Sequence, residues 1–585
     1  MTVVRRWPRS PLAETATAFA ASSFPDSTPD RRRARTATVV HVVSLGVGFA
    51  VVLWANRNQW FFGDEWAFLG RRGVRHGVPG LFEPHNEHWS TSPVLVYRAF
   101  YSLFGVRTYL PYVVVLVVVH LTAAHLLWRV MRRSGVDVAV ATTLGALFVF
   151  LGAGSENLLW AFQIGFIGSV ACGLGALLLV DHDRPFGRRD VAGWAVLVLG
   201  LTCSGIGVPM VAVAGVAVLL RRSTRGLSRR GLRRAALTVA VPAFVYLVWL
   251  TLAGREGLGE RSVVDQLSKL SGFVWAGVSN ALASTLGSSV AAVLVLAGLV
   301  AWMVWRRRLA VTRAAPAFAC AAGVALLFLV LALGRAGLGT AQAGASRYVY
   351  VAVALGLPVA GLMLTDLAAR GRAAELAVLA VVGLVVAYNG FLLGVHAHEE
   401  AIRERRIMGA ILSAADVAVR GEPLVGAMPD PAYNPDVTVD ILRRLARDGK
   451  LPPLVSRATD RMAAASHLQL HVDNHAIPGV PPRLGPLPAE VAQAPGAAPG
   501  CVVLTPQAPR PEVILDLDGP MSLAVRPSAD GALEVTLQDI EPQPVSSEPR
   551  SFRVVPDVVV HVNVVAAVDR VVLGIPGGTT EVCGL

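Results

Sequence analysis

Residues 191–220 read VAGWAVLVLGLTCSGIGVPMVAVAGVAVLL, a stretch without a single charged side chain. As one helix, at ~1.5 Å per residue, it would run ~45 Å, well beyond the ~30 Å hydrocarbon core of a bilayer. Arginines stand at both ends, and Ser204-Gly205-Ile206-Gly207 followed by Pro209 interrupts the middle. We therefore expect two short apolar helices that turn back on each other, with the turn below the outer membrane surface.

Apolar runs of similar character recur through the first two thirds of the chain. The mean hydropathy is +0.54 and only 16% of the residues are charged, which excludes an ordinary soluble protein. The pattern predicts a polytopic α-helical membrane protein with about 11 spans. We place these spans near residues 38–55, 109–128, 138–153, 164–180, 191–203, 207–220, 235–253, 286–305, 314–333, 348–365 and 374–395.

Arginine clusters fall in alternate loops between these spans. They lie at 129–133, 184–189, 221–234, 306–308 and 370–372. The positive-inside rule places these loops and the basic N-terminus in the cytoplasm. Eleven crossings of the plasma membrane then leave the C-terminus outside, whereas ten or twelve would leave it in the cytoplasm.

The net charge of +13 is unevenly distributed. Residues 396–585 carry 16 Lys and Arg against 23 Asp and Glu, a net of −7, so the excess of positive charge belongs to the membrane part. Arginines at membrane ends explain the high pI, and we expect no nucleic-acid partner.

The composition divides the chain into four parts. Charge and proline return after residue 395, and short period-two apolar runs follow residue 500, which predicts a small β-sandwich. Helices are expected at 401–419 and 439–446, and a linker at 478–499. The predicted parts are a disordered cytoplasmic arm (1–37), a transmembrane domain (38–395), an extracytoplasmic helical region and linker (396–499) and an extracytoplasmic β-sandwich-like domain (500–585).

The five cysteines fall into two groups. Cys172, Cys203 and Cys320 lie in predicted spans and are expected to be small packing residues. Cys501 and Cys583 flank the C-terminal segment on the predicted outer side, where an oxidising compartment permits a disulfide between them.

The long loop at 56–108 carries two acidic clusters, Phe61-Phe62-Gly63-Asp64-Glu65-Trp66 and His85-Asn86-Glu87-His88-Trp89. Such groups are costly near hydrocarbon, which favours a chemical role. The aromatic residues around Asp64 suit a segment at headgroup depth, and a surface helix capped by Asp64 would explain them. It would not explain the second cluster.

These residues could also hold a metal ion. Two histidines are few for zinc, but a hard cation such as Mg or Mn could use Asp64, Glu87 and Glu156. Glu156 lies with Gln163 near a short outer loop, and it could equally be a second carboxylate of the site or a helix cap.

A cationic group is available near the start of the tenth predicted span. Arg347 and Tyr348 open that span from outside, and Arg335 begins the loop before it. A guanidinium there suits a phosphate, although Arg347 could simply reach along the membrane surface. Residues 264–278 have amphipathic spacing and could lie along the membrane.

Asp64-Glu65, shortly after the first span, resembles the acidic pair in the first outer loop of the GT-C superfamily of membrane glycosyltransferases. That superfamily includes protein O-mannosyltransferases, aminoarabinose transferases of lipid A and arabinofuranosyltransferases. The resemblance covers roughly residues 38–395 and extends to the many spans and the C-terminal outer domain.

The resemblance implies transfer of a sugar from a polyprenyl-phosphate donor to an envelope glycan, lipid or protein at the outer face, with inversion. Asp64 would act as base, supported by Glu65. His85, Glu87, His88, Glu156 and Gln163 would bind substrate, and Arg347 with Tyr348 would stabilise the leaving phosphate. A multispan transporter or flippase is the alternative, for which the broken 191–220 segment is the best argument. An enzyme like O-antigen ligases or polymerases is a second one.

Overall fold

The computed structural model describes the chain in two compact units, each described here by itself. The first unit comprises Met1–Arg57, Val78–Pro93 and Tyr112–Glu400, and the second comprises Asn58–Gly77, Val94–Pro111 and Ala401–Leu585. The described residues are 28–71, 79–222, 229–255, 263–306, 313–420, 428–430, 434–454, 457–496, 498–509, 511–540, 544–565 and 568–585. Residues 1–27, most of the predicted N-terminal arm, lie outside them.

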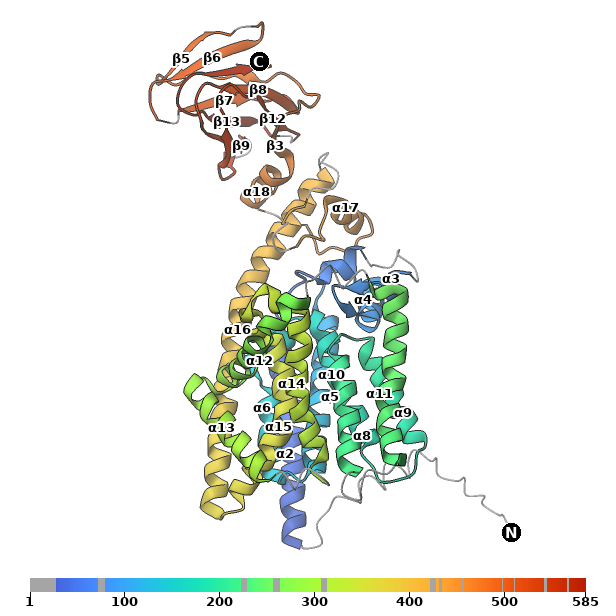
Figure 1. The fold of residues 1–585 in the computed structure, drawn as a ribbon. Coiled ribbons are helices and arrows are strands. Elements are labelled where there is room, and N and C mark those ends of the chain that lie inside the picture. The colour runs from blue at the N-terminus through green and yellow to red at the C-terminus, as the bar shows by residue number, and fades with distance from the viewer. Residues whose placement is uncertain are drawn as a thin grey trace, which may run out of the picture. The chain divides into compact units, whose positions relative to one another are not determined.

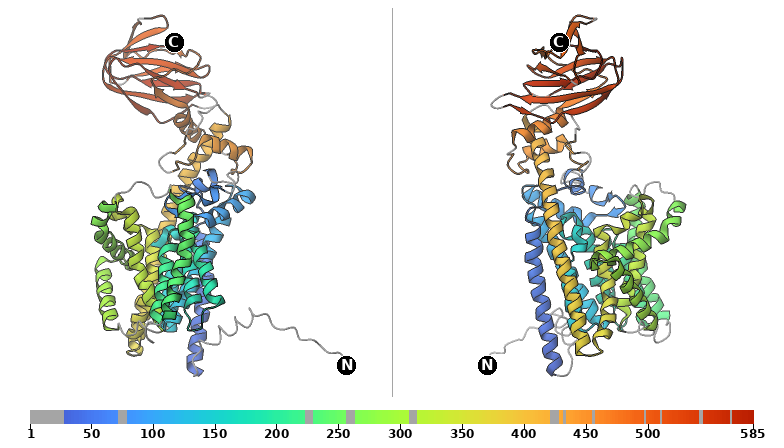
Figure 2. Two further views of the ribbon diagram at one scale, coloured as in Figure 1. Left: turned by 45° about the vertical axis from the view of Figure 1, so that its right-hand side comes forward. Right: turned by 90° about the vertical axis from the view of Figure 1, so that its left-hand side faces the viewer.

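The first unit is a helical bundle in which long apolar helices run roughly alongside one another (Figures 1 and 2). Helices α4, α5 and α16 also contribute residues to the second unit. The α-helices with residues in the bundle are α2 (Thr28–Ala55), α3 (Pro79–Phe82), α4 (Thr91–Phe104), α5 (Leu110–Ser134), α6 (Val138–Val149), α7 (Ser155–Leu159), α8 (Ile164–Val180), α9 (Arg188–Leu201), α10 (Gly207–Arg222), α11 (Arg229–Trp249), α12 (Val263–Leu286), α13 (Ser289–Trp305), α14 (Ala315–Arg335), α15 (Ser346–Ala368) and α16 (Arg372–Arg420).

The fold class is confirmed as multispan helical, but the number of candidate spans is smaller than predicted. Among the described residues, 7 helices are long and apolar enough to cross a membrane, or up to 9 if each bent helix pair is one span. One bent pair joins α6 to α7, and the other joins α12 to α13 at an angle of 115°. The difference from eleven lies in α9 and α10, which are too short to qualify. Without these two helices, nine spans remain of the predicted eleven. Nine is also an odd number, so the prediction that the N- and C-termini lie on opposite sides of the membrane is unchanged.

The break in the 191–220 stretch is where the sequence predicts it. Helix α9 ends at Leu201 and α10 begins at Gly207. Helices α8, α9, α10 and α11 pack side by side (Figure 1). Glycine permits the closest approach: a Cβ at Gly173 of α8 would lie 2.2 Å from Met210 of α10, and one at Gly193 of α9 would lie 2.6 Å from Val180. At these glycines a side chain of the neighbouring helix packs directly on the backbone, as expected for helices that associate in lipid.

Helix α2 begins earlier than the boundary predicted at residue 38. It includes residues 28–37, so the described part of the predicted disordered arm is helical. Arg33 in this first part forms ion pairs with Asp137 at 2.9 Å and Glu375 at 2.7 Å. These ion pairs tie the polar first turns of α2 to other helices of the bundle, which the sequence pattern does not reveal.

The predicted amphipathic segment at 264–278 is helical as part of α12. It packs against α14 and α15, and its Phe273 is fully buried. The segment is therefore a packed element of the bundle.

The second unit gathers three separate stretches of chain. It contains the π-helix η1 (Ala67–Arg71), most of α4, and the C-terminal end of α16, followed by α17 (Val439–Arg447) and α18 (Ala458–Gln469). Both predicted helical segments after residue 400 are thus found. The N-cap of α17 is Thr438, whose side chain accepts a hydrogen bond from the amide of Ile441.

The C-terminal region contains two antiparallel six-stranded sheets (Figure 2). One has the order β10-β9-β13-β7-β4, with β11 also paired to β9, and the other has the order β3-β12-β8-β14-β6-β5. Buried and exposed side chains alternate along β8 and β9, which fits the period-two pattern. The strands are β3 (Leu470–Asp473), β4 (Arg483–Leu484), β5 (Val491–Pro495), β6 (Cys501–Pro506), β7 (Glu512–Asp516), β8 (Met521–Pro527), β9 (Gly531–Asp539), β10 (Val545–Ser546), β11 (Arg550–Val554), β12 (Val560–Val564), β13 (Arg570–Gly574) and β14 (Thr580–Cys583).

The stretch 478–499, which the sequence predicts as a linker, contains strands. The β-rich region therefore begins before the predicted boundary at residue 500. Strands β4 and β5 arise within this stretch and pair with β7 and β6, and β3 precedes it. Proline is tolerated because β4 and β5 are edge strands of their sheets.

Candidate functional site

The cluster His85-Asn86-Glu87-His88 forms a tight hairpin in the first unit. Strands β1 (Pro84–His85) and β2 (His88–Trp89) pair with His85 opposite His88, which leaves Asn86 and Glu87 as the two-residue turn. Asn86 has φ +50, a left-handed conformation that asparagine tolerates better than most residues. The turn therefore presents the Glu87 side chain at its tip.

Two aromatic contacts fix the hairpin to the bundle. The Trp89 ring stacks on Trp249 at 5.1 Å with an interplanar angle of 1°, and the Trp249 Nε1 donates to the carbonyl of Phe82 at 2.8 Å. His85 is buried and meets Phe162 edge-on at 5.3 Å. These contacts leave the loop little freedom to move relative to α8 and α11.

The break between α9 and α10 holds His88. The backbone amide of Gly205 donates to His88 Nδ1 at 3.2 Å, and a Cβ at Gly205 would lie 2.6 Å from that nitrogen. Ser92 also binds the break, with its amide donating to the carbonyl of Thr202 at 3.0 Å. The interruption that decides the helix boundaries thus supplies a hydrogen-bond donor to the hairpin.

Glu87 forms an ion pair with Arg335 at the end of α14. Arg335 Nε donates to Glu87 Oε1 at 2.8 Å, and Nη2 donates to the same oxygen. Burial opposes ionisation of Glu87, but the charge of His88 in its protonated form and the guanidinium of Arg335 outweigh burial and lower the pKa of Glu87. Burial lowers the pKa of His88 to about 4, against the opposing charge of Glu87, so His88 is neutral at pH 7. A neutral His88 accepts from Gly205 through Nδ1 and carries its proton on Nε2, 3.8 Å from Glu87 Oε1.

A second ion pair joins α15 to the α6–α8 connection. Arg347 Nη1 donates to Glu156 Oε2 at 3.0 Å, and the hydroxyl of Ser346 accepts from the amide of Glu156 at 3.2 Å. The Glu156 carboxylate therefore binds Arg347. It does not cap a helix, because the N-cap residue of α7 is Gly154.

The Tyr348 ring is a common neighbour of the two guanidinium groups. The Arg347 and Arg335 guanidinium carbons lie 5.1 and 5.8 Å from the centre of its ring, and the ring is fully buried. Phe166 links the groups, with its ring 5.6 Å from His88 and 6.2 Å from Tyr348. We call Glu87, His88, Glu156, Arg335, Arg347 and Tyr348 the arginine cluster.

Two uncharged polar residues of the same α6–α8 connection are buried. Asn157 and Gln163 are 0% and 1% exposed, and within the described structure both polar atoms of the Asn157 side chain and Oε1 of Gln163 have no hydrogen-bond partner. Buried amides without partners are rare and mark places where a ligand or water completes the bonding.

The acidic turn at Asp64-Glu65 belongs to the second unit and has a different chemistry. Glu65 is completely buried, and its carboxylate accepts from the amide of Phe62 at 3.0 Å, from the Tyr109 hydroxyl at 2.8 Å and from the Tyr97 hydroxyl. With three donors already bound, Glu65 has little capacity left for a substrate proton. Its role is to hold the turn.

Asp64 is half-buried, and its backbone carbonyl accepts from Ala67 at 3.2 Å. The preceding Gly63 has φ +58, a conformation that favours glycine. Of the two acidic side chains, Asp64 is thus the more exposed.

Most of the aromatic residues near Asp64, which the sequence suggests for headgroup depth, pack inside the protein. Trp60, Phe61, Trp66 and Phe68 are all buried within the second unit. Trp60 meets Trp66 edge-on at 5.7 Å, and Phe61 meets Tyr109 at 4.8 Å. These rings form a protein core around the turn, which the sequence could not distinguish from a membrane anchor.

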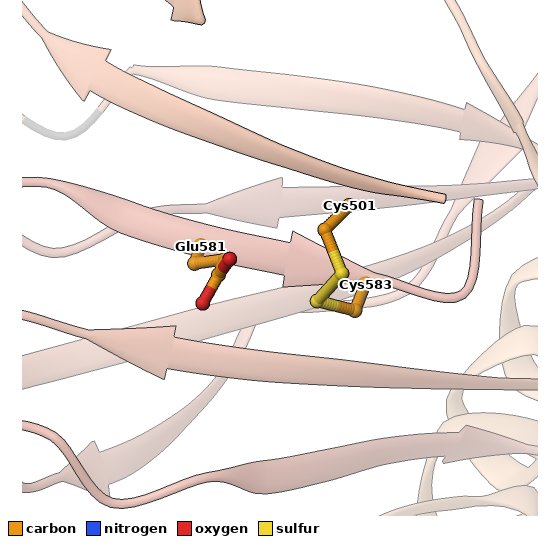
Figure 3. Close-up of side chains that lie close together, drawn as sticks. All are labelled: Cys501, Glu581 and Cys583. Atoms are coloured by element: carbon orange, nitrogen blue, oxygen red, sulfur yellow. A yellow bond between two sulfur atoms is a disulfide. The ribbon is translucent and has the colours of Figure 1, made fainter. Parts of the chain in front are cut away.

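The carboxylates proposed for a metal ion do not form a ligand set. Glu87 and Glu156 already bind arginines, so a cation would have to displace a guanidinium from each. Within the described residues, Cys501, Glu581 and Cys583 are the one group with suitable spacing (Figure 3). Their two sulfur atoms form a disulfide between the paired strands β6 and β14, and Arg526 binds Glu581 at 3.3 Å. A disulfide offers no thiolate, so this group is no metal site.

The fold and cluster define a multispan helical membrane protein with a C-terminal β-rich region and a pair of arginines outside the apolar core. No protein-family model matches the chain, and no curated protein matches it. Among solved structures, it is similar to ArnT from Cupriavidus metallidurans bound to undecaprenyl phosphate, with 14% identity, a TM-score of 0.42, and coverage of 73% of this chain and 87% of that one. It is also similar to the Archaeoglobus fulgidus oligosaccharyltransferase tethered with an acceptor peptide containing the NVT sequon, with 14% identity and a TM-score of 0.38. That match covers 64% of this chain and 57% of the other.

Proposed function

We propose that the chain is a membrane glycosyltransferase that transfers a sugar from a polyprenyl-phosphate donor to an envelope glycan, lipid or protein. The observation that carries the proposal is the arginine cluster, where Arg335 and Arg347 flank one buried tyrosine. Two guanidinium groups so placed suit a phosphate, because each has a planar fork of donors that stays charged at every working pH.

The cluster also has the polar character that a sugar phosphate requires. Each arginine is held by a carboxylate, so its position is fixed before a ligand binds. The buried amides of Asn157 and Gln163 supply unused hydrogen-bonding atoms for hydroxyl groups. Neutral His88 adds a donor at Nε2 without repelling the arginines. Fixed donors of this kind stabilise charge that develops on a leaving phosphate.

The proposal assigns the chemical step to Asp64. Its carboxylate takes the proton of an acceptor hydroxyl as the oxygen forms a bond to the anomeric carbon. The bond between that carbon and the phosphate oxygen breaks, and the lipid phosphate leaves with the electron pair. Attack opposite the leaving group inverts the anomeric configuration. Glu65, which the sequence pairs with Asp64, keeps the turn in shape.

The transporter alternative rests on the broken 191–220 segment, for which the structure offers another explanation. The break provides the amide that binds His88 and the backbone that binds Ser92. In the proposal it is a support for the donor site in the outer loop, and α9 and α10 need not move.

The test is sugar transfer from a panel of polyprenyl-phosphate sugars in membranes that contain the protein. The variants are Asp64→Asn and Arg347→Met, compared at matched expression with Asp530→Asn, an exposed acid of the β-rich region. We expect Asp64→Asn to lose about 10²-fold or more of the rate. Full transfer by Asp64→Asn would move the base elsewhere. Failure of the unaltered protein with every donor, where a control enzyme works, would overturn the proposal and favour transport.

A further inference from the structure

The turn that carries Asp64 is bound by residues far along the chain. The amide of Gly63 donates to Oδ1 of Asn434 at 2.9 Å, although 371 residues separate them. Asn434 is fully buried, and its own Nδ2 donates to Asp430 Oδ2 at 2.8 Å. Since Asp430 accepts from the amide nitrogen, the oxygen of Asn434 must face Gly63. The orientation of this side chain is therefore determined by both of its ends.

A second residue of the same C-terminal segment holds the other end of the aromatic stretch. Glu404 is buried, and its Oε2 accepts from the amide of Trp60 at 2.6 Å. The Arg403 guanidinium lies over the Phe62 ring at 4.9 Å. Further on, Arg444 of α17 donates to the carbonyl of Gly70 at 3.3 Å. Four side chains from the C-terminal part of the chain thus contact the acidic stretch before, within and after the Asp64 turn: Arg403, Glu404, Asn434 and Arg444.

These contacts place Asp64 between two fixed neighbours. Gly63 is held by Asn434, and Glu65 is held by Tyr97 and Tyr109. Gly63 has φ +58, so its amide points in a direction that ordinary residues at this position would not provide. The half-buried Asp64 side chain takes its position from these two neighbours.

We propose that Asn434 is a positioning residue that sets the Asp64 carboxylate for proton removal, so that this one side chain from the C-terminal part of the chain completes the acidic site. The inference rests on the proposed function, in which Asp64 is the base. The oxygen of a base must lie within ~2.6–3.2 Å of the oxygen whose proton it takes. A displacement of ~1 Å can cost ~10²-fold in rate. Loss of the Asn434 oxygen would leave the Gly63 amide without its partner and let the turn shift.

The decisive variants are Asn434→Ala and the exchange Asn434→Asp with Asp430→Asn. The exchange keeps an acceptor for Gly63 and a donor between positions 434 and 430, so it preserves both hydrogen bonds. Asn474→Ala, at an exposed asparagine of the β-rich region, is the matched control. We expect Asn434→Ala to lower kcat about 10- to 100-fold while the KM for the lipid-linked donor stays within about twofold. We expect the exchange to recover most of the loss.

A wild-type kcat in Asn434→Ala, with Asp64→Asn inactive, would overturn the inference and leave the proposed function intact. A rise in donor KM, or no recovery by the exchange, would also overturn it. Full activity of Asp64→Asn would instead remove the base from the proposed function, and the positioning role would fall with it.

A second measurement does not depend on transfer. Asp64→Cys should react with a water-soluble maleimide at a rate that changes several-fold when Asn434→Ala is added, with the protein lacking Asp64→Cys as background. An unchanged rate in a folded protein would show that Asn434 does not set the turn and would overturn the inference.

Discussion

Glu65 and Glu87 are carboxylates of the same loop, yet their surroundings differ completely. Glu65 is bound by two tyrosine hydroxyls and a backbone amide, all uncharged donors. Glu87 is bound by the guanidinium of Arg335 and lies beside a neutral histidine. Three uncharged donors on a completely buried carboxylate make Glu65 part of the core. A guanidinium at a partly exposed carboxylate can exchange that carboxylate for another anion, such as a phosphate. In the proposed function, this contrast separates Glu65 as a structural acid from Glu87 as an acid of the phosphate-binding site.

The largest effect is expected from removing the Glu65 carboxylate. Glu65→Leu would leave two tyrosine hydroxyls and the amide of Phe62 without their acceptor inside a core. At about 1–3 kcal/mol for each buried unsatisfied group, the second unit should lose at least roughly 3 kcal/mol of stability. Thermal unfolding of the purified protein, followed by fluorescence of the buried Trp60 and Trp66, would measure the change.

The partners of Glu65 provide the control. Adding Tyr97→Phe and Tyr109→Phe to Glu65→Leu removes two donors together with the acceptor, and it should restore much of the lost stability, since apolar replacement of both partners is nearly neutral. A Glu65→Leu protein as stable as the original would contradict the structural role. So would a triple variant less stable than Glu65→Leu alone.

The arginine cluster should respond in substrate affinity instead. Arg347→Lys and Arg335→Lys keep the positive charge but lose the planar fork, so each should raise the donor KM about 10-fold or more, roughly 1.5–3 kcal/mol. Stability should change little. Arg553→Lys, on an arginine that is 82% exposed, is the matched control. If the donor KM stays unchanged in both cluster variants, neither arginine binds the phosphate.

Much of the fold follows from the sequence, because apolar runs and period-two strands leave clear patterns. Every predicted span has a helix, and the period-two apolar runs after residue 500 form strands. The predicted break in 191–220 is real, but whether α9 and α10 cross the membrane depends on length, which boundaries of a few residues decide. The linker at 478–499 was misread because proline and alanine also occur in short edge strands.

The sequence was enough to predict which residues belong to the candidate site. It was not enough to predict which of them bind each other. Glu87, His88, Glu156, Arg347 and Tyr348 do gather in the first unit. Nothing in the sequence indicates that Arg335 binds Glu87 or that Gly205 binds His88. The roles of Glu404 and Asn434 were missed because each acts through a backbone amide hundreds of residues away. The Glu404 and Asn434 side chains have no local pattern around them that would signal such a bond.

The hairpin that carries Glu87 and His88 should make the stability of the protein depend on pH. Burial holds the pKa of His88 at about 4, below its ordinary 6.5. The unfolded chain therefore binds more protons than the folded chain between pH 6.5 and about 4, and stability falls as the pH is lowered through this window. The slope contributed by one group is at most about 1.4 kcal/mol per pH unit. His88→Gln should flatten this part of the stability profile, measured by unfolding between pH 4 and 7. An identical profile in the variant would show that His88 has no depressed pKa.

The smallest effect tests the link between the helix break and the hairpin. Gly205→Ala would place a Cβ 2.6 Å from His88 Nδ1, so the imidazole must shift away from its donor. The loss of one hydrogen bond, about 1 kcal/mol, should lower transfer several-fold while leaving the acidic turn of the second unit intact. Gly356→Ala in α15, where a Cβ would meet nothing within 4 Å, is the matched control. If Gly205→Ala transfers sugar as fast as Gly356→Ala, the break does not position His88 for the reaction. The broken segment would then need an explanation other than support of the hairpin.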